Sequence, residues 1–475
     1  MIFLFIATAA LFNSLDPSSV AQSIAYHQLY PEHAPSFKRV MDLLGTACKE
    51  EIAAVGSALG KSSDQLLESE IILIEKLAAR LPNRKLNGYY AHSEKEIFPL
   101  HSAEIDLGMA LLLSQLDGQS DCYLQARRYS AMLDLMALQI LAALPHEATA
   151  IEKIEETNRF IFDKMHFRFP PHSLYADQID RYTFLPSVMD NHLGVCLGVT
   201  ALYLAIAQRI GLSLEIITPP GHIYIRHHQN GQIINIETTA RGTHPISEVY
   251  LGINNRSLRK RDLKEVIGMT YINQGSAYLN ANQFAQALNA YKKAFLYLPE
   301  DILMKELLGY SYILNGQKEE GEKLLNQIKG QIPDEAVVKH GMVEDYLAGN
   351  VGIDGIQVVF SNVDETRNSI IKKQKALQAI MQKYPHFKEG MQQLAVTWIQ
   401  LHRTKEAIKA LHCCMEMDPD NPITAYYLAM LYGERQDFKA CWYYLIQAES
   451  ITAKHNFLPK ALKDLRRMLT AYCPQ

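Results

Sequence analysis

Apolar residues recur every three or four positions over most of the first 165 residues, a spacing that predicts amphipathic helices. Five segments carry the pattern: Phe37 to Gly56, Ser63 to Leu81, Ser102 to Leu116, Tyr123 to Leu144 and Thr149 to Met165. No motif of recognised chemistry interrupts them. We therefore expect residues 1–148 to form a helical N-terminal region that supports a site elsewhere.

The pattern changes after residue 195. A helix is predicted from Cys196 to Ile210, ended by Gly211, and the alternating residues that follow predict strands. The expected strands are Leu214 to Thr218, His222 to His228 and Gln232 to Thr239. Asn230-Gly231 lies between the last two and is a strong signal for a tight hairpin. Residues 149–260 are thus predicted to form an α+β core.

From residue 261 onward the chain is helical again and repeats itself. Three pairs of residues are each separated by 34 positions: Gly275 and Gly309, Tyr278 and Tyr312, Pro299 and Pro333. The first unit resembles a tetratricopeptide repeat at its small and aromatic positions, which are Gly275, Tyr278, Ala287, Tyr291, Ala294 and Pro299. The spacing resumes between Pro385 and Pro419 after an interruption. Residues 261–475 are therefore predicted to stack as an α-solenoid, whose surface is expected to bind a protein or peptide.

Composition and charge narrow the function classes. The length of 475 residues corresponds to about three domains. Lys and Arg total 47 against 51 Asp and Glu, so no basic excess indicates a nucleic-acid partner. The seven cysteines lack Cys-x-x-Cys spacing and predict neither a disulfide framework nor a zinc site. We expect no cofactor and no metal.

The N-terminal apolar run Ile2 to Phe12 has two interpretations. Its length is typical of a signal peptide, with Ser19-Val20-Ala21 as a cleavage site, but no Lys or Arg precedes it. Alternatively, it is the first core helix. The run is shorter than the roughly 20 residues that span a bilayer, so no stable membrane span is expected. The predicted location is cytoplasmic, with export as the alternative if the run is a signal peptide.

Cys196 is the main candidate for chemistry. It stands at the start of a predicted helix, where unpaired N–H groups and the helix dipole favour a thiolate. Its own N–H would be one donor of an oxyanion hole. The alternative is a small buried apolar residue at a helix start.

The predicted hairpin brings a histidine and a carboxylate to one face. With Asn230 and Gly231 as turn residues, alternation places five side chains together: His222, Tyr224, Arg226, Asn235 and Glu237. His222 and Glu237 then become diagonal neighbours, which would complete a Cys-His-acid triad with Cys196. The alternative is that Glu237 forms a structural ion pair with Arg226.

At these residues the sequence resembles the transglutaminase-like superfamily. The resemblance is carried by GVCLGVTALYLAIAQRIGL, PPGHIYIR and INIETT, and it is closer still to the SirB1-type branch, in which such a core is coupled to tetratricopeptide repeats. It implies a papain-like α+β core with Cys196, His222 and Glu237 in the triad positions. Glu237 stands where the family usually has Asp.

Four further residues are candidates for the same site. Asn191 and His192 precede Cys196 and are predicted as an oxyanion donor and a pocket residue. Tyr224 and Asn235 share the predicted face of His222 and Glu237. The basic stretch Arg256 to Lys264 is interpreted as a solvated linker.

Two functions remain open from the sequence. The first is a thiol enzyme that attacks an amide carbonyl through Cys196 to form a thioester, as a protease, deamidase or transglutaminase does. The second is a non-catalytic interaction scaffold in which the repeats bind the partner and the core is a silent platform.

Overall fold

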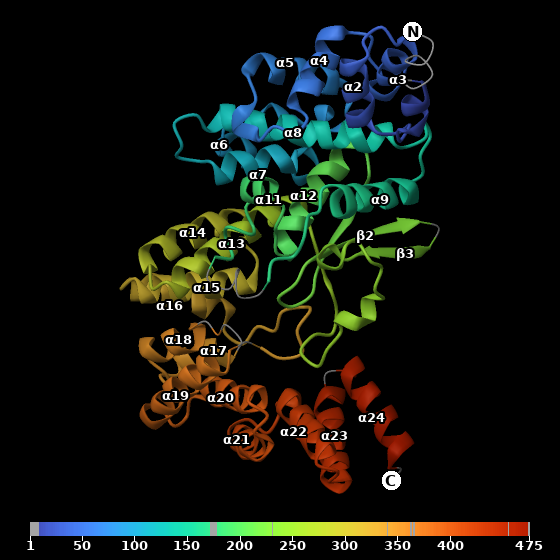
Figure 1. Ribbon diagram of the computed structural model, residues 1–475. Helices are drawn as coiled ribbons and strands as arrows, with labels where there is room; N and C mark the ends of the chain where they lie inside the picture. Colours follow the sequence, from blue (N-terminus) through green and yellow to red (C-terminus); the bar gives the residue numbers. More distant parts are fainter. Residues whose placement is uncertain are drawn as a thin grey trace.

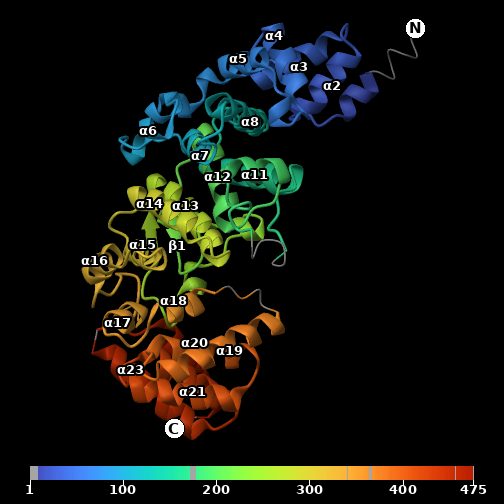
Figure 2. The ribbon, with the colours of Figure 1, turned by 90° about the vertical axis from the view of Figure 1, so that its left-hand side faces the viewer.

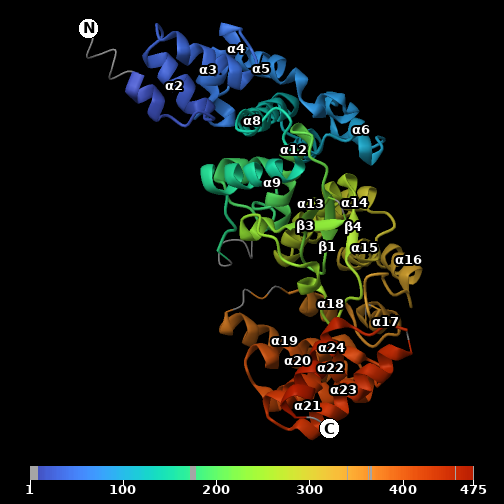
Figure 3. The same cartoon turned by 90° about the vertical axis from the view of Figure 1, so that its right-hand side faces the viewer.

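The computed structural model describes residues 9–171, 178–229, 231–339, 341–361, 363, 366–454 and 456–473. It has a helical N-terminal region, a central α+β core and a C-terminal array of helical hairpins, so the predicted fold class is confirmed (Figure 1). The array begins beside the core and ends at the far side of the molecule from the N-terminal helices, as the two turned views also show (Figures 2 and 3). Residues 2–8 of the apolar N-terminal run lie outside the described residues.

The N-terminal region is helical as predicted, but with different boundaries. Its α-helices are α2 (Val20–Leu29), α3 (Ala34–Leu44), α4 (Lys49–Ala58), α5 (Glu68–Leu77), α6 (Glu94–Ile97), α7 (Leu107–Gln115) and α8 (Cys122–Ala142). The single helix predicted from Phe37 to Gly56 is wrong, because Gly45 adopts a left-handed conformation (φ 64°) that ends α3. The helix predicted from Ser102 begins only at Leu107, where the Asp106 carboxylate accepts a hydrogen bond from the Met109 N–H.

The core contains α-helices and one antiparallel sheet. Its elements are α9 (Ala150–Asn158), α11 (Leu185–Asn191), α12 (Cys196–Arg209), β1 (Glu215–Thr218), β2 (Tyr224–Gln229), β3 (Gln232–Ile236) and β4 (Arg259–Arg261). The strands are ordered β3-β2-β1-β4. Ile225 pairs with Ile236 and Arg226 with Asn235, which is the register predicted from the hairpin. Asn230 lies outside the described residues.

Two predictions for the core need correction. The basic stretch Arg256 to Lys264 is not only a linker, because residues 259–261 pair with β1 as the edge strand β4. Charged side chains are common on edge strands, where they face solvent or neighbouring elements. The strand predicted to begin at His222 begins at Tyr224, since His222 still belongs to the turn and donates its N–H to the Pro219 carbonyl at 3.1 Å.

The C-terminal array consists of helices packed as successive hairpins. They are α13 (Leu263–Asn280), α14 (Phe284–Tyr297), α15 (Ile302–Leu314), α16 (Lys318–Ile328), α17 (Gly341–Leu347), α18 (Ile353–Phe360), α19 (Arg367–Lys383), α20 (Lys388–Gln400), α21 (Thr404–Met417), α22 (Pro422–Glu434), α23 (Phe438–Ala453) and α24 (Lys460–Tyr472). Gly275 shows why the repeat needs small residues, since a Cβ there would lie 2.7 Å from the Tyr291 ring. The interruption between Pro333 and Pro385 contains α17, α18 and α19.

The buried apolar side chains form one large cluster and three smaller ones. The large cluster runs from Val20 to Leu308 and includes α7, α8, α12, α13 and α14. The smaller clusters hold the later repeats together. The N-terminal region, the core and the first hairpin of the array therefore share one interior.

No helix within the described part of the chain combines the length and the apolar character needed to cross a membrane.

Candidate active site

Cys196 is the first residue of α12, a helix that is buried on nearly all sides. The turn that leads into it is held by backbone hydrogen bonds. The Val195 N–H donates to the Tyr182 carbonyl at 2.9 Å, and the Gly194 N–H donates to the Arg168 carbonyl at 3.1 Å. The thiol itself is partly exposed. The fold thus presents Cys196 at a rigid helix start, with unpaired N–H groups and the positive end of the helix dipole beside it.

A glycine in the first turn of α12 allows a neighbouring loop to approach closely. A Cβ at Gly198 would lie 2.4 Å from the Tyr182 carbonyl oxygen, a distance that real side chains do not adopt. The loop and the helix start consequently pack backbone against backbone. This contact fixes the position of Cys196 relative to the loop.

His222 enters the site from the turn before β2. Its Nε2 lies 2.7 Å from Glu237 Oε2, so Nδ1 is the ring nitrogen that does not contact the carboxylate. Burial disfavours the charged imidazolium, but hydrogen bonds with Cys196 and Glu237 outweigh it and raise the pKa of His222 to about 9. A pKa of about 9 favours the imidazolium form of His222 at neutral pH.

Glu237 directly follows β3 and is held by several donors. The Thr239 N–H and hydroxyl donate to Oε1 at 3.1 and 2.6 Å, and the Tyr250 hydroxyl donates to Oε2. Burial favours the neutral acid, but His222, Thr239 and Tyr250 outweigh it and lower the pKa of Glu237 to about 2. Glu237 is therefore a carboxylate over the physiological pH range, and its negative charge balances the positive charge of the imidazolium.

The alternative ion pair between Glu237 and Arg226 does not form. Arg226 Nε instead donates to Glu215 Oε2 at 2.8 Å, across the β1–β2 pair. The carboxylate of Glu215 also meets His228 Nε2 at 2.7 Å. A second histidine–glutamate pair therefore lies on the same sheet, away from Cys196, and offers an internal comparison.

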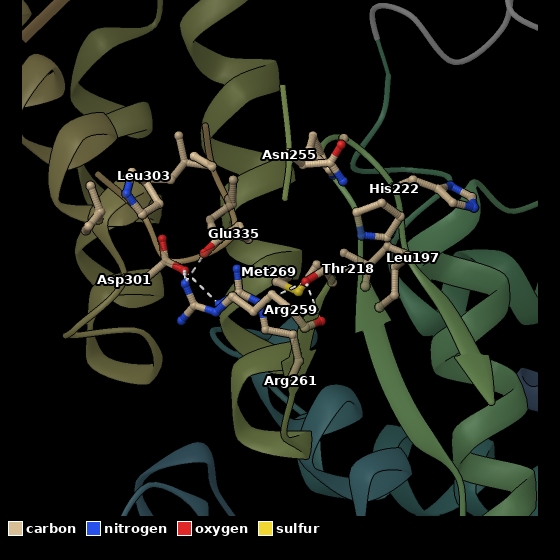
Figure 4. Close-up of a pocket in the computed structure, with 18 of the residues that line it drawn as sticks. Leu197, Thr218, His222, Asn255, Arg259, Arg261, Met269, Asp301, Leu303 and Glu335 are labelled. Atoms are coloured by element: carbon tan, nitrogen blue, oxygen red, sulfur yellow. Dashed lines mark hydrogen bonds and ion pairs between the residues drawn. The ribbon is translucent and has the colours of Figure 1, made fainter. Parts of the chain in front are cut away.

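Cys196 and His222 line a cavity of about 400 Å³ between the core and the repeat array. Figure 4 shows His222 and Leu197 on one side and Asp301 and Leu303 on the other. The far wall contains an ion-pair cluster, since Asp301 Oδ2 lies 2.9 Å from Arg259 and 2.7 Å from Arg261. The remaining lining is largely apolar and includes residues of α13 and α15. The first repeats thus form a wall of the cavity that contains the thiol.

The other predicted site residues lie outside this cavity. Asn191 donates its side-chain amide to the Ser187 carbonyl at 2.8 Å, within its own helix. His192 stacks on Phe167, with ring centroids 4.6 Å apart, and lines a different cavity beside α8. Its left-handed backbone (φ 55°) at the end of α11 turns the chain toward Cys196. The predictions for Asn191 and His192 are therefore not supported by their positions.

Tyr224 and Asn235 are buried in the hairpin and support the site indirectly. The Tyr224 ring stacks on Tyr250 with centroids 4.6 Å apart. The Asn235 amide donates to the Pro245 carbonyl at 2.8 Å and to the Ser247 hydroxyl at 2.9 Å. Both residues thereby hold the loop that carries Tyr250.

Tyr250 and Thr239 contact the acid directly, and sequence reasoning missed both. Thr239 lies two residues after Glu237, a spacing at which a side chain can donate back to its neighbour, so a local signal existed. Tyr250 had no such signal, because it lies 13 positions after Glu237, beyond a stretch of loops and short 3-10 turns. In the part of the chain that the structure describes, no group of three or more His, Cys, Asp or Glu side chains is arranged to hold a metal ion.

Residues 127–286 match the family model described as the transglutaminase-like superfamily. The matched segment runs from α8 into α14 and contains Cys196, His222 and Glu237. This part of the chain is a transglutaminase-like domain, and helical repeats follow it. The narrower likeness to the SirB1-type branch stays a prediction.

Solved structures with similar segments are helical repeat proteins. One titled "MamA MSR-1 C2" is 16% identical, with 40% of this chain and 98% of that chain covered and a TM-score of 0.21. YrrB, titled a TPR protein with an unusual peptide-binding site, is 15% identical, with coverage of 42% and 92% and a TM-score of 0.22. The TPR2AB domain of yeast Sti1 is 15% identical, with coverage of 43% and 97% and a TM-score of 0.22. These TM-scores are too low to assign a fold or a ligand from them. No curated protein matches the chain in sequence.

Proposed function

We propose that this transglutaminase-like domain is a thiol enzyme that attacks a peptide or amide carbonyl through Cys196, with His222 and Glu237 completing the triad. The observation that carries the proposal is the 2.7 Å contact between His222 Nε2 and Glu237 Oε2, on a histidine that shares a cavity with Cys196. Such a contact orients the imidazole and leaves its other nitrogen for the thiol.

The first chemical step forms a thioester. The Cys196 thiolate sulfur bonds to the carbonyl carbon, and the carbonyl π electrons move onto oxygen to give a tetrahedral oxyanion. The Cys196 N–H at the helix start is one donor for that oxyanion. As the oxyanion collapses, the C–N bond breaks and the His222 imidazolium gives its proton to the departing nitrogen.

The second step resolves the thioester. His222, now neutral, takes a proton from water or from an amine, which bonds to the carbonyl carbon as the sulfur leaves as thiolate. Glu237 stabilises the imidazolium that forms again. Peptide cleavage, deamidation and cross-linking share this sequence and differ only in which nitrogen leaves and which nucleophile enters.

The cavity supports a role for the repeats in substrate access. Helices α13 and α15 supply part of its lining, so a substrate that reaches Cys196 also contacts the start of the array. We propose that the array recruits a protein or peptide, part of which enters the cavity. The apolar lining favours a substrate whose reactive amide is flanked by apolar groups.

The reactivity of Cys196 tests the enzyme hypothesis. Alkylation by iodoacetamide at pH 6.5, read by mass spectrometry for each cysteine, should be at least tenfold faster at Cys196 than at Cys122. Both thiols are partly exposed, but burial raises the pKa of Cys122. The advantage should disappear in His222→Gln.

His228→Gln is the matched control for that experiment. It removes the histidine of the other 2.7 Å histidine–glutamate pair on the same sheet and should leave the labelling of Cys196 unchanged. Equal labelling of Cys196 and Cys122 in the unmodified protein would contradict the enzyme hypothesis. That result would favour the scaffold hypothesis, in which the core is silent.

A further inference from the structure

One short segment of the core contacts the candidate active site, the middle of the repeat array and its C-terminal end. This segment, residues 250–256, begins at the last residue of a 3-10 turn (Ser247–Tyr250). It is here called the linking loop. In Figures 1 and 3 the yellow-green chain after the sheet extends toward α24. Its three attachments lie within seven residues.

The first attachment is to the site. The Tyr250 hydroxyl donates to Glu237 Oε2, the same oxygen that His222 Nε2 approaches at 2.7 Å. The Tyr250 ring also stacks on His222, with centroids 5.6 Å apart and planes 23° from parallel. Tyr250 therefore restricts both the rotation of the carboxylate and the tilt of the imidazole.

The second attachment joins the linking loop to the chain between α16 and α17. The Arg256 N–H donates to the Glu335 carbonyl at 2.8 Å, and the Val337 N–H donates to the Asn254 carbonyl at 3.0 Å. Asn255, which is buried, ties this pairing back to the site, because its amide donates to the Tyr250 carbonyl at 3.0 Å. A displacement of the paired segment would thus be transmitted to Tyr250.

The third attachment is apolar. Ile253 is only 5% exposed and belongs to the cluster that holds α22, α23 and α24 together, with Ala425, Trp442, Leu445 and Leu462 among its members. It is the one core residue in that cluster among the residues the structure describes. Ile253 is three positions from Tyr250, so their Cα atoms lie at most about 11 Å apart.

We propose that Tyr250 is a positioning residue for this site and that the C-terminal repeats hold it in place through Ile253. The inference rests on the proposed function, because it assigns a role in the same reaction. The state of α22–α24 then sets how firmly Glu237 and His222 are aligned. A partner that changes the packing of these helices would change the reactivity of Cys196 at a distance.

The test uses the full chain with a substitution at Tyr250 and one at Ile253, a matched control for each, and the double variant. Tyr250→Phe removes the hydroxyl and keeps the ring, with the exposed Tyr443→Phe as its control. Ile253→Ala removes most of the side chain that packs into the apolar cluster of α22–α24. Its control is Ile246→Ala, at a nearby residue that is 61% exposed. Ile253→Val is the milder substitute if Ile253→Ala does not fold. Iodoacetamide labelling of Cys196 is measured from pH 4 to 9.

Tyr250→Phe should slow labelling of Cys196 at pH 6.5 about tenfold, because a hydrogen bond to a charged group is lost. The acid limb of the pH profile should move upward, since an imidazolium that is less well held supports the thiolate less. The groups that face His222 are Cys196, Glu237 and Tyr250. Ile253→Ala should slow labelling about threefold, with no further loss in the Tyr250→Phe background.

Each failure identifies a different error. Unchanged labelling and an unchanged acid limb in Tyr250→Phe would overturn the positioning role and leave the proposed function intact.

The double variant tests the link to the repeats. If its labelling rate falls by the product of the two single-variant factors, Ile253 and Tyr250 act independently and the link is overturned. If Cys196 of the unmodified protein shows no enhanced labelling, the proposed function fails, and an NMR titration of His222 decides the inference. A lower His222 midpoint in both variants supports it, and an unmoved midpoint overturns it.

Discussion

The first hairpin of the repeat array and the later repeats share a helical pattern, but they belong to different interiors. Helices α13 and α14 pack into the same apolar cluster as α7, α8 and α12. Helices α20–α24 instead pack into two smaller clusters, one of which also contains Ile253 of the core. The predicted boundary at residue 260 thus separates two sequence patterns, whereas the largest interior continues across it.

The comparison indicates a division of labour within one array. The first repeats form a wall of the cavity beside Cys196, so part of their surface lines that cavity and is not free to bind a separate partner. Among the described residues, Ile253 is the one core residue in the apolar cluster of α22–α24, so we expect more of the surface of these later repeats to serve a partner. Four predictions test this difference, beginning with the largest expected effect.

Asp134→Ala should destabilise the shared interior most. The fully buried Asp134 accepts a hydrogen bond from Arg209 Nε at 2.8 Å and also pairs with Arg84. Without it, the Arg84 guanidinium loses its buried partner and Arg209 keeps only the longer ion pair of 3.6 Å with Asp106, so the free energy of unfolding should fall by about 3 to 5 kcal/mol. Urea denaturation measures the loss. Asp420→Ala removes the exposed pair with Lys454 in the later repeats and should cost less than about 1 kcal/mol.

The His222–Glu237 pair should make the stability of the core depend on pH. The folded pKa of His222, about 9, exceeds its unfolded value near 6.5, so the contribution is complete below about pH 6.5 and is lost as the pH rises through 9. The loss is on the order of 3 kcal/mol. At the acid end, Glu237 has a folded pKa of about 2, so its contribution is present above about pH 4.5 and is lost as the pH falls through 2.

Urea unfolding at pH 6 and pH 9.5 measures this dependence. His222→Gln should reduce it, whereas His412→Gln should leave it in place, since the His412 ring in the later repeats meets the hydroxyls of Tyr432 and Tyr444. An equal pH dependence in the unmodified protein and in His222→Gln would contradict the prediction.

Gly275→Ala should destabilise the first hairpin by about 1 to 3 kcal/mol, because its Cβ would collide with the Tyr291 ring. Gly433 in α22 is a helical glycine of the later repeats at a different repeat position, and a Cβ there would lie 3.3 Å from Cys441 Sγ. Gly433→Ala should therefore cost little, since helix propensity gains up to about 1 kcal/mol. Thermal unfolding compares the two variants, and equal costs would argue against the difference in packing.

Glu449→Ala should have the smallest effect. Its two-pronged ion pair with Arg466 joins α23 and α24, and because the Arg466 side chain is 43% exposed we expect a contribution of about 1 kcal/mol. The labelling rate of Cys196 should stay the same. A loss above about 2 kcal/mol would show that the last helices depend on charge more than on their apolar cluster.

Local patterns in the sequence determined a large part of this protein. Helical periodicity, the 34-residue spacing and the Asn230-Gly231 signal were enough to predict an α+β core, a helical array and the register of β2 with β3. The meeting of His222 with Glu237 followed from that register, because the two residues are linked by one short hairpin. Patterns of this kind depend on neighbours within a few residues or across one turn.

Only the tertiary structure decided what surrounds the site. The Tyr250 hydroxyl on Glu237, the placement of Ile253 among α22–α24 and the wall formed by α15 all join segments far apart in the chain or separated by irregular loops. Asn191 and His192 were predicted to line the cavity but lie outside it. Tertiary structure decided this too, since α11 ends in a left-handed residue that redirects the chain. Such contacts depend on how whole helices pack. The residue pattern of one segment does not indicate which distant segment will pack against it.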